Sequence, residues 1–67
     1  MLKEIIREDA ELIWHLLTTN DRLTPEQLEV LTGYRNEYLY LILGWLSKED
    51  RIGFIETTDG LIIIVNK

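Results

Sequence analysis

Apolar side chains recur at helical spacing in the first third of the chain, with mostly acidic residues on the opposite face. The apolar stripe consists of Ala10, Ile13, Trp14 and Leu17. This period predicts an amphipathic helix from about Glu8 to Thr19. Apolar residues continue upstream, but Asp9 would interrupt a continuous apolar face. The pattern therefore leaves open whether residues 1–8 extend this helix or form a separate arm.

The clearest start signal for a second helix is the stretch TPEQ, residues 24–27. It places a hydroxyl at the N-cap, proline at the first helical position and glutamine at the third, which predicts a capping box. Leu23 and Leu28 flank the cap at the spacing of a hydrophobic staple. Leu28 and Leu31 predict the inner face of a short helix, and Thr32-Gly33 should end it.

The segment NEYLYLILGWL, residues 36–46, follows the short second helix after a turn, where a helix-turn-helix would have the helix that enters a DNA groove. Most of its side chains are nevertheless apolar. We expect Asn36 to cap this helix and the helix to run to Glu49 or Asp50. One stripe has the spacing of a core face and consists of Leu39, Ile42, Leu43 and Leu46. A second stripe lies beside it and consists of Tyr34, Tyr38, Leu41 and Trp45. This second stripe either packs under the first helix or the hairpin, or forms a subunit interface.

Toward the C-terminus the sequence changes to two runs rich in β-branched residues, Ile52 to Thr57 and Leu61 to Val65. Thr58-Asp59-Gly60 lies between them, and Asp-Gly in that place is typical of a β-hairpin. Residues around Leu23 could add a short third strand. The order of elements predicts an α+β winged helix-turn-helix, with three helices followed by a two-stranded β-hairpin wing, in a single domain over residues 1–67.

Family resemblance agrees with this order. The stretch RLTPEQLEVLTGYRNEYLYLILGWLSKEDRIGFIE, residues 22–56, is similar to the winged helix-turn-helix pattern. With Ile13-Trp14 and Leu43-Gly44-Trp45-Leu46 as its specific part, the chain resembles a family of small stand-alone bacterial and archaeal winged helix-turn-helix proteins of unassigned function. Members often carry glycines where this chain reads IREDAE, residues 6–11, so the shape of the N-terminal arm stays open. The resemblance implies a DNA-binding-type scaffold and supplies no catalytic residues.

Size and composition point to outside support for so small a fold. A chain of 67 residues buries only about 60% of the surface that its unfolded form exposes. Small domains usually add a disulfide, a metal or a partner subunit. The chain has no cysteine and one histidine, which leaves no disulfide and no ligand set for structural zinc. We therefore expect a homodimer.

Charge argues against a strong general affinity for DNA. Seven Lys and Arg residues against twelve Asp and Glu residues give a net charge of −5, whereas such affinity comes mostly from cations that neutralise phosphates. The stretch from Ile52 to Asn66 contains no Lys or Arg, and Glu56 and Asp59 lie near the expected wing tip. Residues that could still contact DNA are Arg35, Asn36, Tyr40 and Lys48.

The run LIIIV, residues 61–65, is apolar on both faces of its strand, where a strand with one face in water would alternate. On a possible edge strand, such a run risks aggregation unless a partner chain or the N-terminal arm covers it. The candidate dimer interface combines this hairpin with the second stripe of the third helix, at Tyr38, Leu41, Trp45, Ile55, Ile62 and Ile64.

No catalytic, cofactor or small-molecule site is evident. His15 with Glu11 four residues before it is more typical of a solvated helix face than of a base and its orienter. No glycine-rich phosphate loop occurs. No apolar run approaches the roughly 18–20 residues that span a bilayer, and the N-terminus lacks the pattern of a signal peptide, so we expect a cytoplasmic, non-enzymatic protein. The leading hypothesis is a homodimeric protein–protein interaction module, and the alternative is a DNA-binding transcriptional regulator.

Overall fold

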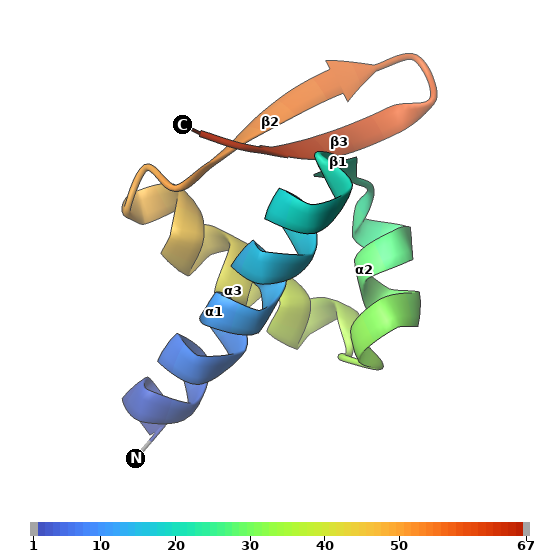
Figure 1. The fold of residues 1–67 in the computed structure, drawn as a ribbon. Helices are drawn as coiled ribbons and strands as arrows, with labels where there is room; N and C mark the ends of the chain where they lie inside the picture. The colour runs from blue at the N-terminus through green and yellow to red at the C-terminus, as the bar shows by residue number, and fades with distance from the viewer. Residues whose placement is uncertain (1, 67) are drawn as a thin grey trace.

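The computed structural model describes residues 2–66. Three helices lie under one face of a three-stranded antiparallel sheet (Figure 1). The elements are α1 (Leu2–Asn20), β1 (Arg22–Leu23), α2 (Pro25–Thr32), α3 (Asn36–Lys48), β2 (Ile52–Thr57) and β3 (Gly60–Val65). This order confirms the predicted α+β winged helix-turn-helix, including the short third strand at Leu23.

The first helix settles the question left open at the N-terminus. Residues 2–20 form one continuous helix, so no separate arm exists within the described residues. Asp9 does not interrupt the packing of this helix, because its carboxylate is half-buried and accepts a hydrogen bond from the Tyr38 hydroxyl of α3. Ile6, one turn before Ala10, is buried as well. The stripe of apolar residues therefore extends a turn further than the sequence pattern predicts.

Helix α2 begins as predicted. The Thr24 hydroxyl accepts the Gln27 N–H at 3.1 Å, and the Gln27 side-chain oxygen accepts the Thr24 N–H at 2.9 Å, which completes the capping box. Gly33 ends the helix with φ of 74° and donates its N–H to Glu29 O at 2.8 Å. The prediction that Leu31 shares the inner face with Leu28 is wrong, because Leu31 is 54% exposed while Leu28 is fully buried.

Helix α3 and its N-cap each begin one residue earlier than predicted. The N-cap is Arg35, whose backbone is extended and whose carbonyl accepts the Leu39 N–H at 2.8 Å. Asn36 is already the first helical residue and does not cap the helix, so that prediction is wrong. The reason is geometric, since a cap residue needs non-helical φ and ψ while its carbonyl starts the helical ladder. The helix ends at Lys48, within a residue or two of the predicted end.

The sheet has the strand order β1-β3-β2, which places the apolar run of residues 61–65 on the central strand. The expectation of an edge strand there is therefore wrong. Leu23 of β1 pairs with Ile63 on one side of β3, and Phe54 of β2 pairs with the same residue on the other side. Strand β2 is left at one edge of the sheet. Strand β1 pairs with β3 only at Ile63 and Ile64, and neighbouring strands leave the outer face of the sheet uncovered.

One hydrophobic cluster joins all three helices to the sheet. Its fully buried side chains include the predicted core face of α3, together with residues of α1, α2 and β3: Ile13, Leu17, Leu28, Leu39, Ile42, Leu43, Leu46 and Ile63. Ile63 stands in the middle of the sheet and faces the helices. The cluster therefore sets the orientation of α3 and of the wing, and it decides which of their side chains remain outside.

Candidate interaction surfaces

The side of α3 that faces away from the core carries all of the expected DNA contacts. Arg35, Asn36, Tyr40 and Lys48 are exposed, together with Glu37, Leu41 and Gly44. The spacing of Tyr40, Gly44 and Lys48 places them along one line of the helix. Two cations and two anions lie between Arg35 and Glu49, so this segment has no net charge. The surface is thus accessible to a ligand, yet it lacks the positive charge that a phosphate backbone attracts.

The second stripe of α3 is largely occupied within the chain. Tyr38 is half-buried, donates its hydroxyl to Asp9 of α1 and meets the Tyr34 ring edge to face at 5.3 Å. Trp45 is also half-buried and packs against the core cluster. Leu41 alone of these residues is well exposed, at 52%. The stripe therefore divides into side chains that pack toward α1 and the core and one leucine that does not.

The contact with Asp9 also changes the acidity of Tyr38. The hydrogen bond to the Asp9 carboxylate, with a smaller contribution from burial, raises the pKa of Tyr38 to about 12. The phenol is the donor in this bond, and its ionisation would place two negative charges side by side. Tyr38 consequently remains a neutral hydrogen-bond donor through the physiological range, and its polar tip is directed to α1.

Arg51, in the turn between α3 and β2, contacts Glu11 and Trp14 of α1. The Arg51 guanidinium donates two hydrogen bonds to the Glu11 carboxylate, at 2.7 and 3.3 Å, and stacks over the Trp14 ring at 4.7 Å. Glu49 lies 3.9 Å from the same guanidinium. The bond from Arg51 lowers the pKa of Glu11 and, reciprocally, raises the pKa of Arg51. Sequence reasoning missed this cluster because Glu11 and Arg51 are 40 positions apart, and it removes one cation from the set available to DNA.

The outer face of the sheet carries a row of isoleucines. Ile55 and Ile62 are directly opposed on β2 and β3, and Ile64 follows two residues later on β3, opposite Gly53. Opposed residues of an antiparallel pair share a face, and alternate residues change face. Because Ile63 faces the helices, these three isoleucines face the other way, where no helix lies (Figure 1). Ile55 is 41% exposed and the other two are half-buried by their neighbours in the sheet.

The tip of the wing is acidic. Glu56 and Asp59 are exposed beside the turn, in which the Thr57 hydroxyl accepts the Asp59 N–H at 3.2 Å and donates to Gly60 O at 2.9 Å. Arg22 is the one charged residue on the described part of the outer sheet face. It lies on β1, opposite Ile64 of β3 in the strand register. A DNA phosphate approached by this wing would meet carboxylates rather than cations.

Neither a metal site nor a membrane span is formed by the described residues. No group of three His, Cys, Asp or Glu side chains within residues 2–66 could hold a metal ion. His15 is exposed, with its ring edge to face against Trp14 at 5.8 Å. None of the three helices is long and apolar enough to cross a bilayer.

Comparison with known proteins defines the family rather than a specific activity. No curated protein and no solved structure matches the chain. The family described as "Winged helix-turn-helix domain (DUF2582)" matches residues 1–66. The fold has the helix order and the wing that this description requires, on a DNA-binding-type scaffold. The chain therefore belongs to this winged helix-turn-helix domain family.

Proposed function

We propose that the domain is a non-enzymatic protein–protein interaction module that forms a homodimer through the outer face of its sheet. The observation that carries this proposal is the row Ile55, Ile62 and Ile64, which no helix of the chain covers. Apolar rows of this kind on a sheet gain free energy when a second surface removes them from water. A twofold pair would stack the row of one subunit on the same row of the other, as an isologous interface requires.

The electrostatics of the scaffold favour this role over DNA reading. Arg51 is engaged with Glu11, and the wing between Ile52 and Asn66 contributes only acidic charge. Arg35 and Lys48 are the cations of α3 and its N-cap, and Glu37 and Glu49 balance them. A protein that makes few phosphate contacts has little of the salt-dependent affinity on which most DNA binders depend.

Mass measurement in solution tests the dimer directly. Light scattering of the unchanged chain at tens of micromolar should give twice the 7.9 kDa chain mass. The double variant Ile55→Thr, Ile62→Thr keeps β-branched side chains but removes apolar area from the row, and it should shift the protein toward the monomer. Val30→Thr is the matched control, since Val30 is exposed on α2, away from the sheet face. A monomeric parent chain, or a double variant that stays as dimeric as the control, would refute the proposal.

The alternative function is a DNA-binding regulator, and the exposure of Arg35, Asn36, Tyr40 and Lys48 on one side of α3 favours it. Selection from a random pool of DNA duplexes at low salt tests this role. A regulator should enrich one sequence, and Arg35→Ala should relax the preference at one base pair, whereas Lys48→Ala should weaken all complexes and reduce their salt dependence. If no duplex is retained at low salt, this alternative is excluded.

A further inference from the structure

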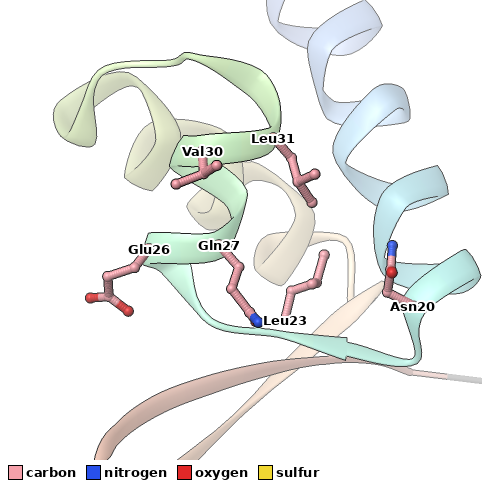
Figure 2. A pocket seen from close by; sticks show the side chains of 6 residues that line it. All are labelled: Asn20, Leu23, Glu26, Gln27, Val30 and Leu31. Atoms are coloured by element: carbon pink, nitrogen blue, oxygen red, sulfur yellow. The ribbon is translucent and has the colours of Figure 1, made fainter.

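A groove on the helix side of the molecule is separate from both surfaces described above. It lies between the end of α1, strand β1 and helix α2, and has a volume of about 430 Å³ (Figure 2). That volume is within the range of about 300–1,000 Å³ that is typical of ligand sites. The groove is lined by Asn20, Leu23, Glu26, Gln27, Val30 and Leu31.

The apolar walls of the groove arise from the short length of α2. This helix has eight residues and buries Pro25 and Leu28, whereas Val30 and Leu31 lie on a side that stays exposed. Val30 is 84% exposed, the largest exposed fraction among the large apolar side chains of residues 3–66, and Leu31 is 54% exposed. Leu23 is buried and forms the floor between them and α1.

The polar groups at the rim are arranged to meet a peptide backbone. Asn20 donates its side-chain amide to Leu16 O at 2.8 Å, which leaves its carbonyl oxygen as an acceptor at the rim. Gln27 uses its carbonyl oxygen in the capping box, which leaves its NH₂ group as a donor, directed toward Leu23 in Figure 2. One acceptor and one donor on opposite sides of a groove match the N–H and C=O groups of an extended chain.

The charge beside the groove is negative. Glu26 lines it and also lines a second hollow of about 330 Å³, toward the wing tip, to which Asp59 and Leu61 contribute. No Lys or Arg lines either hollow among the described residues. Arg22 is near in sequence but pairs with Ile64, on the outer face of the sheet. Nucleic acid would therefore be repelled from this groove, whereas a cationic segment would be attracted to it.

We propose that this groove binds a short cationic segment of a partner protein in extended conformation. An apolar side chain of that segment lies between Val30 and Leu31 over Leu23, and a neighbouring Lys or Arg pairs with the Glu26 carboxylate. Asn20 and Gln27 hold the backbone of the segment. This role is additional to dimerisation through the sheet and does not depend on it, because the groove lies on the other side of β1.

Three synthetic peptides of equal length test the recognition. The first alternates Lys and Leu, the second replaces each Lys by Glu, and the third replaces each Leu by Ser. Amide NMR spectra of the chain should show that the Lys–Leu peptide shifts the signals of Leu23, Val30 and Leu31. Binding of the other two peptides should be weaker by about tenfold or more, which corresponds to losing one good contact.

Variants at exposed positions separate the groove from general stickiness. Val30→Ser and Glu26→Gln should each weaken binding of the Lys–Leu peptide by about tenfold. Leu41→Ser and Glu37→Gln are the controls on α3, an apolar-to-serine change and a Glu-to-Gln change at exposed positions outside the groove, and they should leave binding unchanged. Light scattering on Val30→Ser should give the same mass as the parent chain, which keeps failure of this proposal distinct from failure of the dimer.

Several outcomes would overturn the proposal. Equal binding of the Glu–Leu peptide would mean that charge has no part in recognition. Equal loss in the control variants would place the peptide elsewhere. Shifts of Leu23, Val30 and Leu31 on dilution without peptide would assign the groove to a second copy, and shifts of the same residues with a DNA duplex would assign it to nucleic acid.

Discussion

Replacement of Tyr38 by phenylalanine tests whether this residue serves the fold or an interface. The substitution keeps the ring, including its edge-to-face contact with Tyr34, and removes only the hydroxyl that donates to Asp9. That hydrogen bond joins α1 to α3 across 29 positions of sequence. We expect Tyr38→Phe to lower the free energy of unfolding and to leave the mass in solution unchanged.

The expected loss can be bounded from the pKa of Tyr38. A rise from 10.0 to about 12 sets an upper bound of roughly 3 kcal/mol, since each pKa unit corresponds to roughly 1.4 kcal/mol. Part of that figure is repulsion between a phenolate and the Asp9 carboxylate, which does not exist at neutral pH. Both groups are also partly exposed to water, which screens the interaction. A net loss of about 1 kcal/mol is therefore expected, in the range of ordinary protein hydrogen bonds.

Urea unfolding of the two proteins at neutral pH measures this loss. In a separate thermal unfolding experiment, a change of about 1 kcal/mol should lower the melting temperature of so small a domain by roughly 4–8 °C. Asp9→Ala and the double variant complete a thermodynamic cycle, and the coupling between the two positions should also be about 1 kcal/mol.

The pH dependence provides a second check with a definite sign. Because the folded pKa of Tyr38 is raised above its ordinary value of 10.0, the hydroxyl contributes stability that is fully present below pH 10 and is lost as the pH rises toward about 12. The parent chain should therefore lose stability over that range faster than Tyr38→Phe does. Equal stability of the two proteins at neutral pH, zero coupling to Asp9, or a variant that turns monomeric while remaining folded would refute the structural role.

Three further predictions concern elements that position the surfaces. Thr24→Ala removes one half of the capping box and should cost about 1 kcal/mol in urea unfolding; an unchanged unfolding midpoint would show that the box is not formed in solution. Gly33→Ala should lower the free energy of unfolding by about 1 kcal/mol, because φ is 74° there and an L-residue is strained in that conformation. No atom lies within 4 Å of the added methyl, so a clash does not contribute. The control Gly44→Ala has the same open space in mid-helix and should stabilise the domain by up to about 1 kcal/mol; changes of the same sign at both glycines would contradict the backbone argument. Glu11→Gln should lower the free energy of unfolding by less than about 1 kcal/mol at neutral pH. This difference from the parent chain should vanish in acid, because the lowered pKa of Glu11 gives stability that is lost as the pH falls below 4.5. A difference that persists in acid would assign the effect to something other than the bond with Arg51.

The start and end of α2 illustrate what could be predicted from the sequence. Thr24, Pro25 and Gln27 interact within a single turn, and Gly33 adopts its left-handed conformation without help from distant residues. The core face of α3 follows in the same way from periodicity, because four apolar side chains at helical spacing have one side of the helix in common. The wing followed from two β-branched runs with a turn between them.

Asn36 marks the limit of that local reasoning. An asparagine before an apolar run is a good cap candidate, but the backbone of Arg35 is the one that is extended. The difference is a single residue, and it depends on how the turn after α2 directs the chain into α3. The side chains predicted to contact DNA lie at exposed positions on the side of α3 away from the core, as their helical spacing indicates.

Contacts between residues far apart in the chain were decided only by the tertiary structure. The sequence pattern has Asp9 interrupting the apolar face of the first helix and leaves open whether the helix extends upstream, whereas in the fold Asp9 accepts a hydrogen bond from Tyr38. The run LIIIV lies on the central strand because β1, about 40 residues earlier in the chain, pairs with it. Leu31 is left outside because a helix of eight residues presents only one buried face. The sequence determined the elements, since helix, cap and hairpin signals act over a few residues. The fold alone decided which apolar side chains remain in water, since that depends on which elements meet.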